Sequence, residues 1–97
     1  LSRHGVPIRL SEERLAHITR RHPEMLGQET KILETVSEPD LIQEGDVGTR
    51  IALKHYAGTP LTEKFCAVVY REVTDGFVLT AYFCSRYAAG RRSIWKR

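Results

Sequence analysis

FCAVVYREVTDGFVLTAYFCSR, residues 65–86, is the stretch that decides the fold. Its two halves, residues 65–73 and 77–86, are rich in β-branched and aromatic residues, which favour strands. Between them stands Thr74-Asp75-Gly76, and Asp-Gly between two such runs is a strong hairpin signal. The stretch therefore predicts two adjacent antiparallel strands.

A two-residue turn at Asp75-Gly76 would also set the register of this hairpin, pairing Arg71 with Thr80 and Val69 with Tyr82. Because side chains alternate along a strand, Arg71, Thr80 and Tyr82 would then share one face. The other face is apolar and is expected to be core. Its members are Val68, Tyr70, Leu79, Ala81 and Phe83.

Two helices are predicted upstream of the hairpin. Ser11 stands at an N-cap position before two acidic residues, and Pro23 ends the helical pattern, which gives a helix over residues 12–22. Residues 28–37 repeat the helical spacing up to Pro39.

The rest of the chain alternates as strands do. Residues 41–43 and 50–57 are candidate strands, and residues 91–97 could add an edge strand that ends at Trp95. The order lacks a βαβ rhythm. We therefore predict an α+β fold in one domain, residues 1–97, with two N-terminal helices on one face of an antiparallel sheet of about four strands.

The composition is that of a globular protein with a mild preference for polyanions. The 97 residues carry a net charge of +3 and a pI near 9.1. Arginines crowd the first helix and the C-terminal end, whereas residues 29–46 are acidic. No apolar run reaches the roughly 20 residues of a membrane span. We expect a cytoplasmic protein whose thiols, Cys66 and Cys84, are reduced and point to opposite sheet faces.

Several kinds of site are disfavoured by spacing. No glycine-rich phosphate loop is followed by Lys-Ser/Thr, and no serine stands in a nucleophile elbow. His17 and His22 are five residues apart and diverge on a helix, so they do not form a zinc pair. The cysteines lack CxxC spacing. We therefore predict no metal site and no cofactor.

Motifs along the chain resemble a known nuclease family. They are Arg14-Leu-Ala-His-Ile-Thr-Arg-Arg-His-Pro-Glu24, Pro39-Asp40, Val78-Leu-Thr-Ala-Tyr-Phe83 and Ile94-Trp95. This combination is similar to that of the phage-type barnase/EndoU/colicin/RelE-like nucleases (PBECR-type), over about residues 8–96. Cys84 stands where a Thr is common in that pattern. The resemblance implies a barnase/RelE-like fold, metal-independent RNA cleavage and use as a toxin or phage effector.

The resemblance also implies a set of site residues. Carried over by position, it points to catalytic roles for His17, Arg21, His22, Thr80 and Tyr82, and to a substrate contact for Glu24. Other candidates come from charge and strand alternation. These substrate-binding candidates are Lys54, Tyr56, Arg71, Arg86 and Trp95.

Each candidate has a structural alternative. His22 shares a helix face with Leu15 and Ile18, as a core histidine would, and His17 lies on a polar face that solvent could cover. Glu24 could simply accept backbone N–H groups in a turn, and Trp95 could cover a sheet edge.

The sequence supports two functional hypotheses. The first is an endoribonuclease that makes a 2′,3′-cyclic phosphate by general acid and base catalysis. The second is a noncatalytic RNA- or protein-binding module on the same fold. RNA is the expected partner, and an antitoxin or immunity protein is a further candidate.

Overall fold

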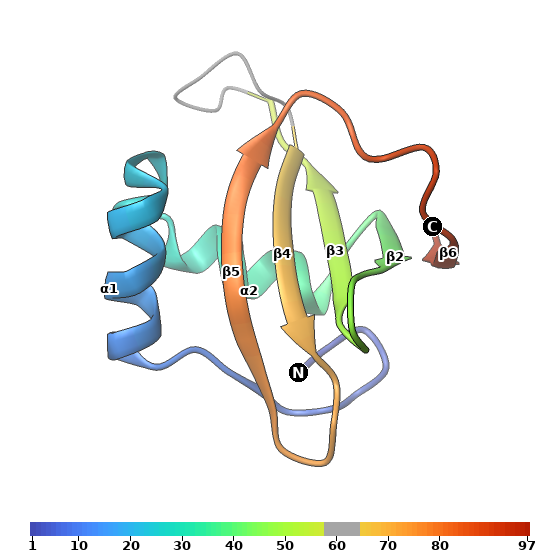
Figure 1. Ribbon diagram of the computed structural model, residues 1–97, viewed down its shortest axis with the longest axis horizontal. Helices are drawn as coiled ribbons and strands as arrows, with labels where there is room; N and C mark the ends of the chain where they lie inside the picture. Colours follow the sequence, from blue (N-terminus) through green and yellow to red (C-terminus); the bar gives the residue numbers. More distant parts are fainter. Residues whose placement is uncertain (58–64) are drawn as a thin grey trace.

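The computed structural model describes residues 1–57 and 65–97 and has an α+β architecture (Figure 1). Within these residues the sheet has six strands, in the order β1-β5-β4-β3-β2-β6. All neighbouring strands are antiparallel except β1 and β5, which are parallel. The predicted sheet of about four antiparallel strands was therefore wrong. The elements are β1 (Ile8–Arg9), α1 (Glu12–Arg21), the 3₁₀ turn η1 (Pro23–Met25), α2 (Glu29–Ser37), β2 (Leu41–Glu44), β3 (Arg50–His55), β4 (Phe65–Arg71), β5 (Gly76–Cys84) and β6 (Ser93–Lys96).

The first helix begins at Glu12, as the sequence predicts, and ends at Arg21, one residue before the predicted end. The hydroxyl of Ser11 accepts a hydrogen bond from the backbone N–H of Arg14 at 3.1 Å. At the other end the N–H of His22 donates to the carbonyl of Ile18, and Pro23 follows. In Figure 1, α1 runs beside β5 while α2 crosses behind β4 and β3. Among the described elements, α2 therefore crosses the broad back of the sheet, α1 packs at its β5 edge, and no helix covers the front.

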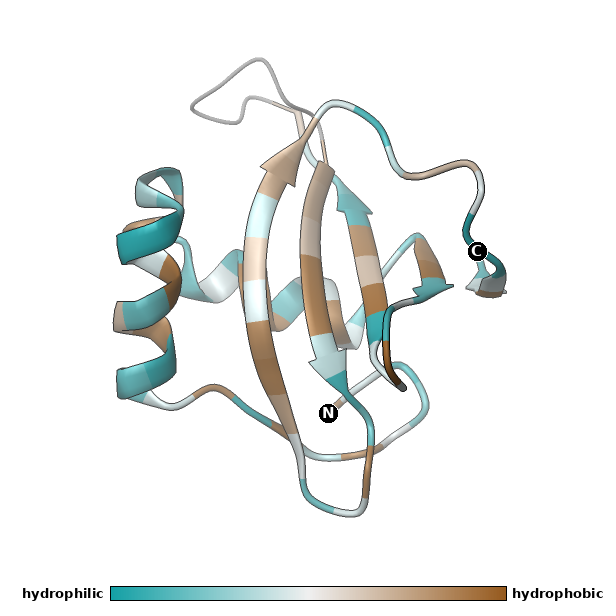
Figure 2. Ribbon diagram, in the orientation of Figure 1, coloured by the Kyte–Doolittle hydropathy of each residue, from teal (hydrophilic) through white to brown (hydrophobic). Residues whose placement is uncertain are grey.

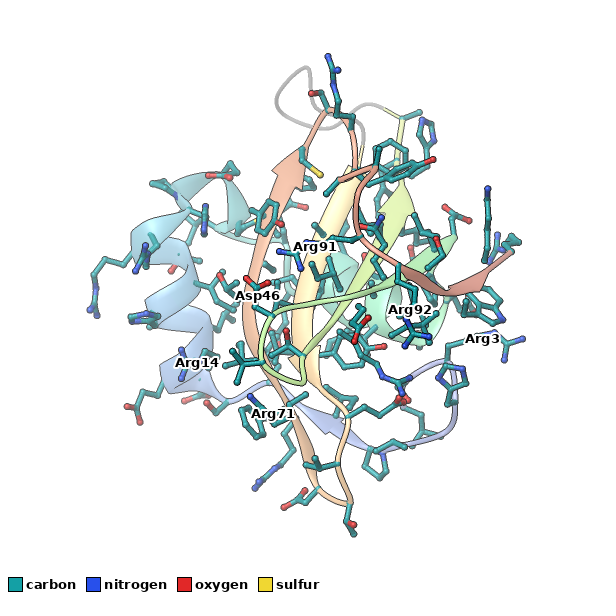
Figure 3. The ribbon with its side chains drawn as sticks, turned by 45° about the vertical axis from the view of Figure 1, so that its right-hand side comes forward. Arg3, Arg14, Asp46, Arg71, Arg91 and Arg92 are labelled. Carbon is teal, nitrogen blue, oxygen red and sulfur yellow. The ribbon has the colours of Figure 1, made fainter. Side chains whose placement is uncertain are left out.

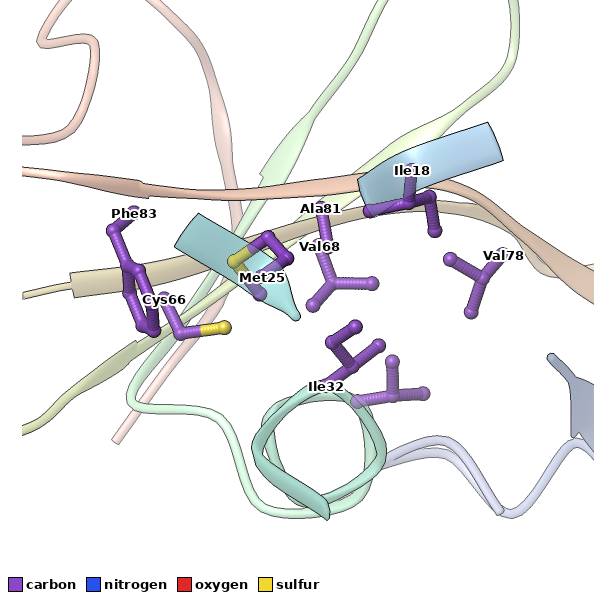
Figure 4. Close-up of a cluster of buried hydrophobic side chains, with 9 residues drawn as sticks. Ile18, Met25, Ile32, Cys66, Val68, Val78, Ala81 and Phe83 are labelled. Atoms are coloured by element: carbon purple, nitrogen blue, oxygen red, sulfur yellow. The ribbon is translucent and has the colours of Figure 1, made fainter. Parts of the chain in front are cut away.

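The main hydrophobic core lies between the sheet and the helical elements. Ile18 of α1, Met25 of η1 and Ile32 of α2 are fully buried there (Figure 4). They meet Val68 and Ala81 from the two central strands. Burial of side chains of this size contributes about 1.5–3 kcal/mol each, so this core holds α1 and η1 against β5.

A smaller apolar cluster lies on the opposite face of the sheet. It contains the buried residues Leu41, Ile51, Leu53 and Ala67, with Tyr82 packed against it. Both faces of the central strands are therefore apolar, as the brown colouring of β3, β4 and β5 shows in Figure 2. This second cluster supports the face on which Thr80 and Tyr82 lie.

The hairpin of β4 and β5 forms, but its register differs from the predicted one. Val69 pairs with Thr80 instead of Tyr82, and Tyr82 pairs with Ala67. The register then shifts, so that Tyr70 pairs with Val78 and Leu79 is bulged. Because the displacement before this bulge is two residues, Thr80 and Tyr82 keep their common face.

Two other predictions fail beyond this bulge. Val78, rather than Leu79, enters the main core. Arg71 pairs with Phe77 and not with Thr80. A bulge adds one residue to one strand, so it exchanges the faces of the residues beyond it.

The N-terminal segment explains why the tight Asp75-Gly76 turn does not form. Glu72 leaves the strand and accepts hydrogen bonds from the Ser2 hydroxyl and from Arg50 Nη1, the latter at 2.6 Å. The N–H of Gly76 donates to the carbonyl of Pro7, where β1 runs alongside β5. These long-range partners outcompete the local turn, so four residues join β4 to β5 instead of two.

The two cysteines lie on opposite faces of the sheet and form no disulfide. Cys66 is fully buried in the main core and opposes Phe83. Burial raises the pKa of the Cys66 thiol to about 11. Cys84 opposes Phe65 and packs beside the second cluster. In the described part of the chain, no helix is long and apolar enough to cross a membrane.

Candidate functional site

The candidate site lies on the sheet face that α2 does not cover. Thr80 and Tyr82 project from β5 onto this face, and Arg71 does so from β4. Two connecting segments lie over parts of it: the loop between β2 and β3, and the segment that leads from β5 to β6 (Figure 3). The face therefore combines strand side chains with loop side chains, as binding sites commonly do.

The end of α1 brings a histidine against this face. The ring centroids of His22 and Tyr82 lie 5.6 Å apart, with the rings tilted by 33°. On its other side, His22 Nδ1 is 3.8 Å from a carboxylate oxygen of Glu24. Three residues from the predicted site, His22, Glu24 and Tyr82, thus come together because Ile18 and Met25 anchor the helix end on the core.

Tyr82 is held in its protonated form by its surroundings. It is half-buried, and this burial raises the pKa of its phenol. The nearby Cys84 raises the pKa further, whereas the positive charge of Arg91 lowers it. At neutral pH the phenol is therefore a hydrogen-bond donor beside a cation.

Arg91 is the cation that reaches the centre of this face. Its Nη1 atom lies 3.1 Å from the Asp46 carboxylate and 3.3 Å from the carbonyl of Glu44. The hydrogen bond and charge of Asp46 raise the pKa of Arg91. Arg91 and Asp46 are labelled side by side in Figure 3, in front of the central strands.

The loop that carries Asp46 is fixed by a second arginine. Arg71 Nη2 donates to the carbonyl of Val47 at 3.0 Å. Val47 and Gly48 both have positive φ, and a Cβ on Gly48 would lie 3.2 Å from Arg71 Nη1. Glycine therefore allows the loop to approach Arg71 closely. On the α1 side, Arg14 Nη1 donates to the carbonyl of Leu79 at 3.4 Å.

Three predicted substrate-binding residues lie away from this face. Lys54 and Tyr56 are on the helix side, where the Lys54 ammonium donates to the carbonyl of Glu38 at 2.9 Å and the Tyr56 hydroxyl donates to Glu34. Trp95 lies in β6, at the sheet edge opposite β1, with the Arg3 guanidinium 4.8 Å from its ring centroid. Lys54 caps the C-terminal end of α2, which is a structural role.

The remaining predicted residues divide between two surfaces. His17 and Arg21 are exposed on α1, and His17 lines a groove with Arg14 and Arg20 rather than facing Tyr82. Arg86 follows β5 and lines a cavity that also includes Tyr82. The structure therefore brings His22, not His17, to the sheet.

Sequence reasoning missed Asp46, and it treated Arg91 as one of several basic residues at the C-terminal end. No local signal distinguishes Arg91 from its neighbour Arg92, which instead pairs with Glu44 at 3.0 Å. Which of these two arginines reaches the sheet face depends on the path that the chain takes from β5 to β6. In residues 1–57 and 65–97, no group of three or more His, Cys, Asp or Glu side chains is placed to hold a metal ion.

Comparisons with known proteins matched this chain to no family, no curated protein and no solved structure.

Proposed function

We propose that this protein is a metal-independent endoribonuclease that cleaves RNA to leave a 2′,3′-cyclic phosphate. The observation that carries the proposal is the contact of His22 with Tyr82, beside Arg91, on an open sheet face. It places an imidazole, a phenol and a guanidinium next to one another. RNA cleavage by transesterification needs a base, an acid and a cation.

The proposed base is His22. The imidazole removes the proton of the 2′-hydroxyl, and the resulting oxygen attacks the adjacent phosphorus. Glu24 has a carboxylate oxygen 3.8 Å from Nδ1, within ion-pair distance of the imidazolium that forms. The side chain of His22 is one-third exposed, so RNA can reach it.

The proposed acid is Tyr82. As the bond from phosphorus to the 5′-oxygen breaks, the phenol gives its proton to the leaving oxygen. An alkoxide is a far stronger base than a phenolate, so this transfer is favourable even though burial raises the pKa of Tyr82. The imidazolium of His22 then returns its proton to the phenolate, which restores both groups.

The proposed electrostatic partner is Arg91, with Thr80 as a neighbouring hydroxyl. A guanidinium matches the geometry of phosphate oxygens and stays charged at all relevant pH values. In the unliganded protein Arg91 binds the Asp46 carboxylate, which is 82% exposed and can give way to a phosphate. Thr80, two residues from Tyr82 on β5, can donate to the same phosphate.

The decisive experiment is incubation of the purified protein with RNA in EDTA, followed by analysis of the fragment ends. We expect 2′,3′-cyclic phosphate and 5′-hydroxyl ends. His22→Ala should lower the rate by about 10²- to 10⁴-fold, the loss typical of a proton-transfer group. His17→Ala is the matched control, because His17 lies on the outer surface of α1.

Thermal unfolding of both variants separates catalysis from folding. A folded His22→Ala protein with undiminished cleavage would exclude His22 as the base. A folded wild-type protein that binds RNA without cleaving it would instead support the noncatalytic binding module.

A further inference from the structure

A cavity of about 480 Å³ opens on the candidate face, immediately beside Tyr82. This volume is within the range of small-ligand pockets, about 300–1,000 Å³. Ile51 and Leu53 of β3, both buried, form its floor. Other lining residues come from β2, from β5 and from the segment that follows β5, among them Gln43, Tyr82, Arg86, Tyr87 and Ala89.

One polar side chain of the cavity lining, Gln43, is held in place by a hydrogen bond. Gln43 is only 2% exposed, and its Nε2 atom donates to the carbonyl of Ala88 at 2.7 Å. This bond holds residues 85–89 over the sheet and orients the amide. An amide has one oxygen acceptor and two N–H donors, so Gln43 can still bind a planar polar ligand.

An aromatic ring flanks the cavity on its outer side. Tyr87 is 41% exposed, and its ring lies edge-on against Phe65 with centroids 6.0 Å apart. Phe65 packs against the second apolar cluster, so it supports the Tyr87 ring while part of that ring faces solvent. A supported and exposed aromatic ring is a suitable stacking platform.

We propose that this cavity binds one unpaired nucleobase of the RNA, next to the phosphate that is cleaved. The inference depends on the proposed ribonuclease function for its choice of ligand. The ligand should be a flat heteroaromatic ring with polar edges. The apolar floor and the two tyrosines suit its faces, and the oriented amide of Gln43 suits its edge. Arg86 at the rim and Arg91 beside Tyr82 supply charge for the backbone on either side.

The cavity also predicts a preference for single-stranded RNA over duplex RNA. A base can enter only if its faces are unstacked and its pairing edge is turned toward Gln43. A-form duplexes do not present bases in this way, whereas single-stranded loops and ends do. The protein should therefore bind and cleave single-stranded RNA in preference to duplex RNA.

The test uses 2′-O-methyl RNA hexamers, which lack the nucleophilic hydroxyl and are not cleaved. Hexamers of A, C and U are compared with an abasic hexamer of the same length. Tyr87→Ala should weaken binding of base-containing hexamers by about 5- to 150-fold, because stacking on one aromatic ring contributes that much. Tyr87→Phe, which keeps the ring, should bind as the wild type does. The abasic hexamer should bind weakly and ignore both changes.

A second variant tests whether Tyr87→Ala weakens RNA binding only indirectly. Ala89→Trp adds a large side chain at an exposed position of the cavity wall and should block base-containing hexamers. If Tyr87→Ala and Ala89→Trp both bind like the wild type, the base pocket is refuted even where RNA cleavage is intact. If binding depends on Tyr87 but no RNA is cleaved, the pocket stands and the ribonuclease proposal fails.

Discussion

Arg91 Nη1 and a carboxylate oxygen of Asp46 lie 3.1 Å apart, although the two residues are 45 positions apart in the chain. This ion pair joins the loop between β2 and β3 to the segment that precedes β6. It also means that Arg91, whose charge acts on Tyr82, already has an anionic partner in the unliganded protein. Any phosphate that binds Arg91 must compete with Asp46.

We therefore expect Asp46→Asn to strengthen RNA binding. Removing the carboxylate charge frees Arg91 for phosphate, and because the pair is exposed the gain should be modest, roughly two- to fivefold at low salt. Fluorescence anisotropy with the 2′-O-methyl hexamers measures it. Asp75→Asn is the matched control, since Asp75 pairs with Arg9 at 2.9 Å near the hairpin end. If both variants raised the RNA affinity equally, the gain would come from the net charge of the protein and not from the release of Arg91.

The role of Tyr82 as the acid can be tested with a substrate that needs no acid. Tyr82→Phe should cleave ordinary RNA about 10²- to 10⁴-fold more slowly. A substrate with sulfur in place of the 5′-bridging oxygen has a thiolate leaving group, which departs without protonation. We expect this substrate to restore most of the lost rate. Equal losses on both substrates would assign Tyr82 to binding instead of proton transfer.

The buried thiol of Cys66 predicts how stability depends on pH. Its pKa is raised from 9.0 to about 11, so the unfolded thiol ionises while the folded one does not. The contribution of this thiol to stability is complete below pH 9 and is lost as the pH rises through 11, by about 2–3 kcal/mol in total. Urea unfolding at pH 8 and pH 10.5 measures the loss.

Cys66→Ala is the comparison for this titration. The variant should be less stable at pH 8, because it leaves a cavity in the core. Between pH 8 and pH 10.5 the free energy of unfolding should decrease less in this variant than in the wild type. A parallel decrease in both proteins would show that other groups, such as the tyrosines, cause the alkaline loss.

The parallel pairing of β1 with β5 depends on a glycine. A Cβ on Gly76 would clash with Ile8 Cδ1 and would lie 2.7 Å from the carbonyl oxygen of Arg71. We expect Gly76→Ala to destabilise the protein by about 1–3 kcal/mol, because backbone must move to relieve the second contact. Gly90→Ala is the control, since nothing lies within 4 Å of its added Cβ. Thermal unfolding that finds equal stability in both variants would contradict this account.

Much of the secondary structure was predictable from local pattern. The Ser11 cap, the apolar spacing through Ile18 and the stop at Pro23 act within one or two helical turns, and the helix forms where they indicate. The hairpin of β4 and β5 likewise follows from two β-rich runs in succession. These features depend on neighbours in sequence, so no knowledge of the rest of the chain is needed to infer them.

Register and site composition depended on the tertiary structure. The Asp75-Gly76 turn is favoured only by its local sequence, and it does not form. The N–H of Gly76 instead donates to the carbonyl of Pro7, and Glu72 accepts from the Ser2 hydroxyl. Local pattern also could not rank His17 against His22, because only the docking of α1 on β5 brings one of them to Tyr82. A local turn is weaker than several long-range hydrogen bonds and ion pairs made together. For that reason the strands could be anticipated, whereas the partners that define the candidate site could not.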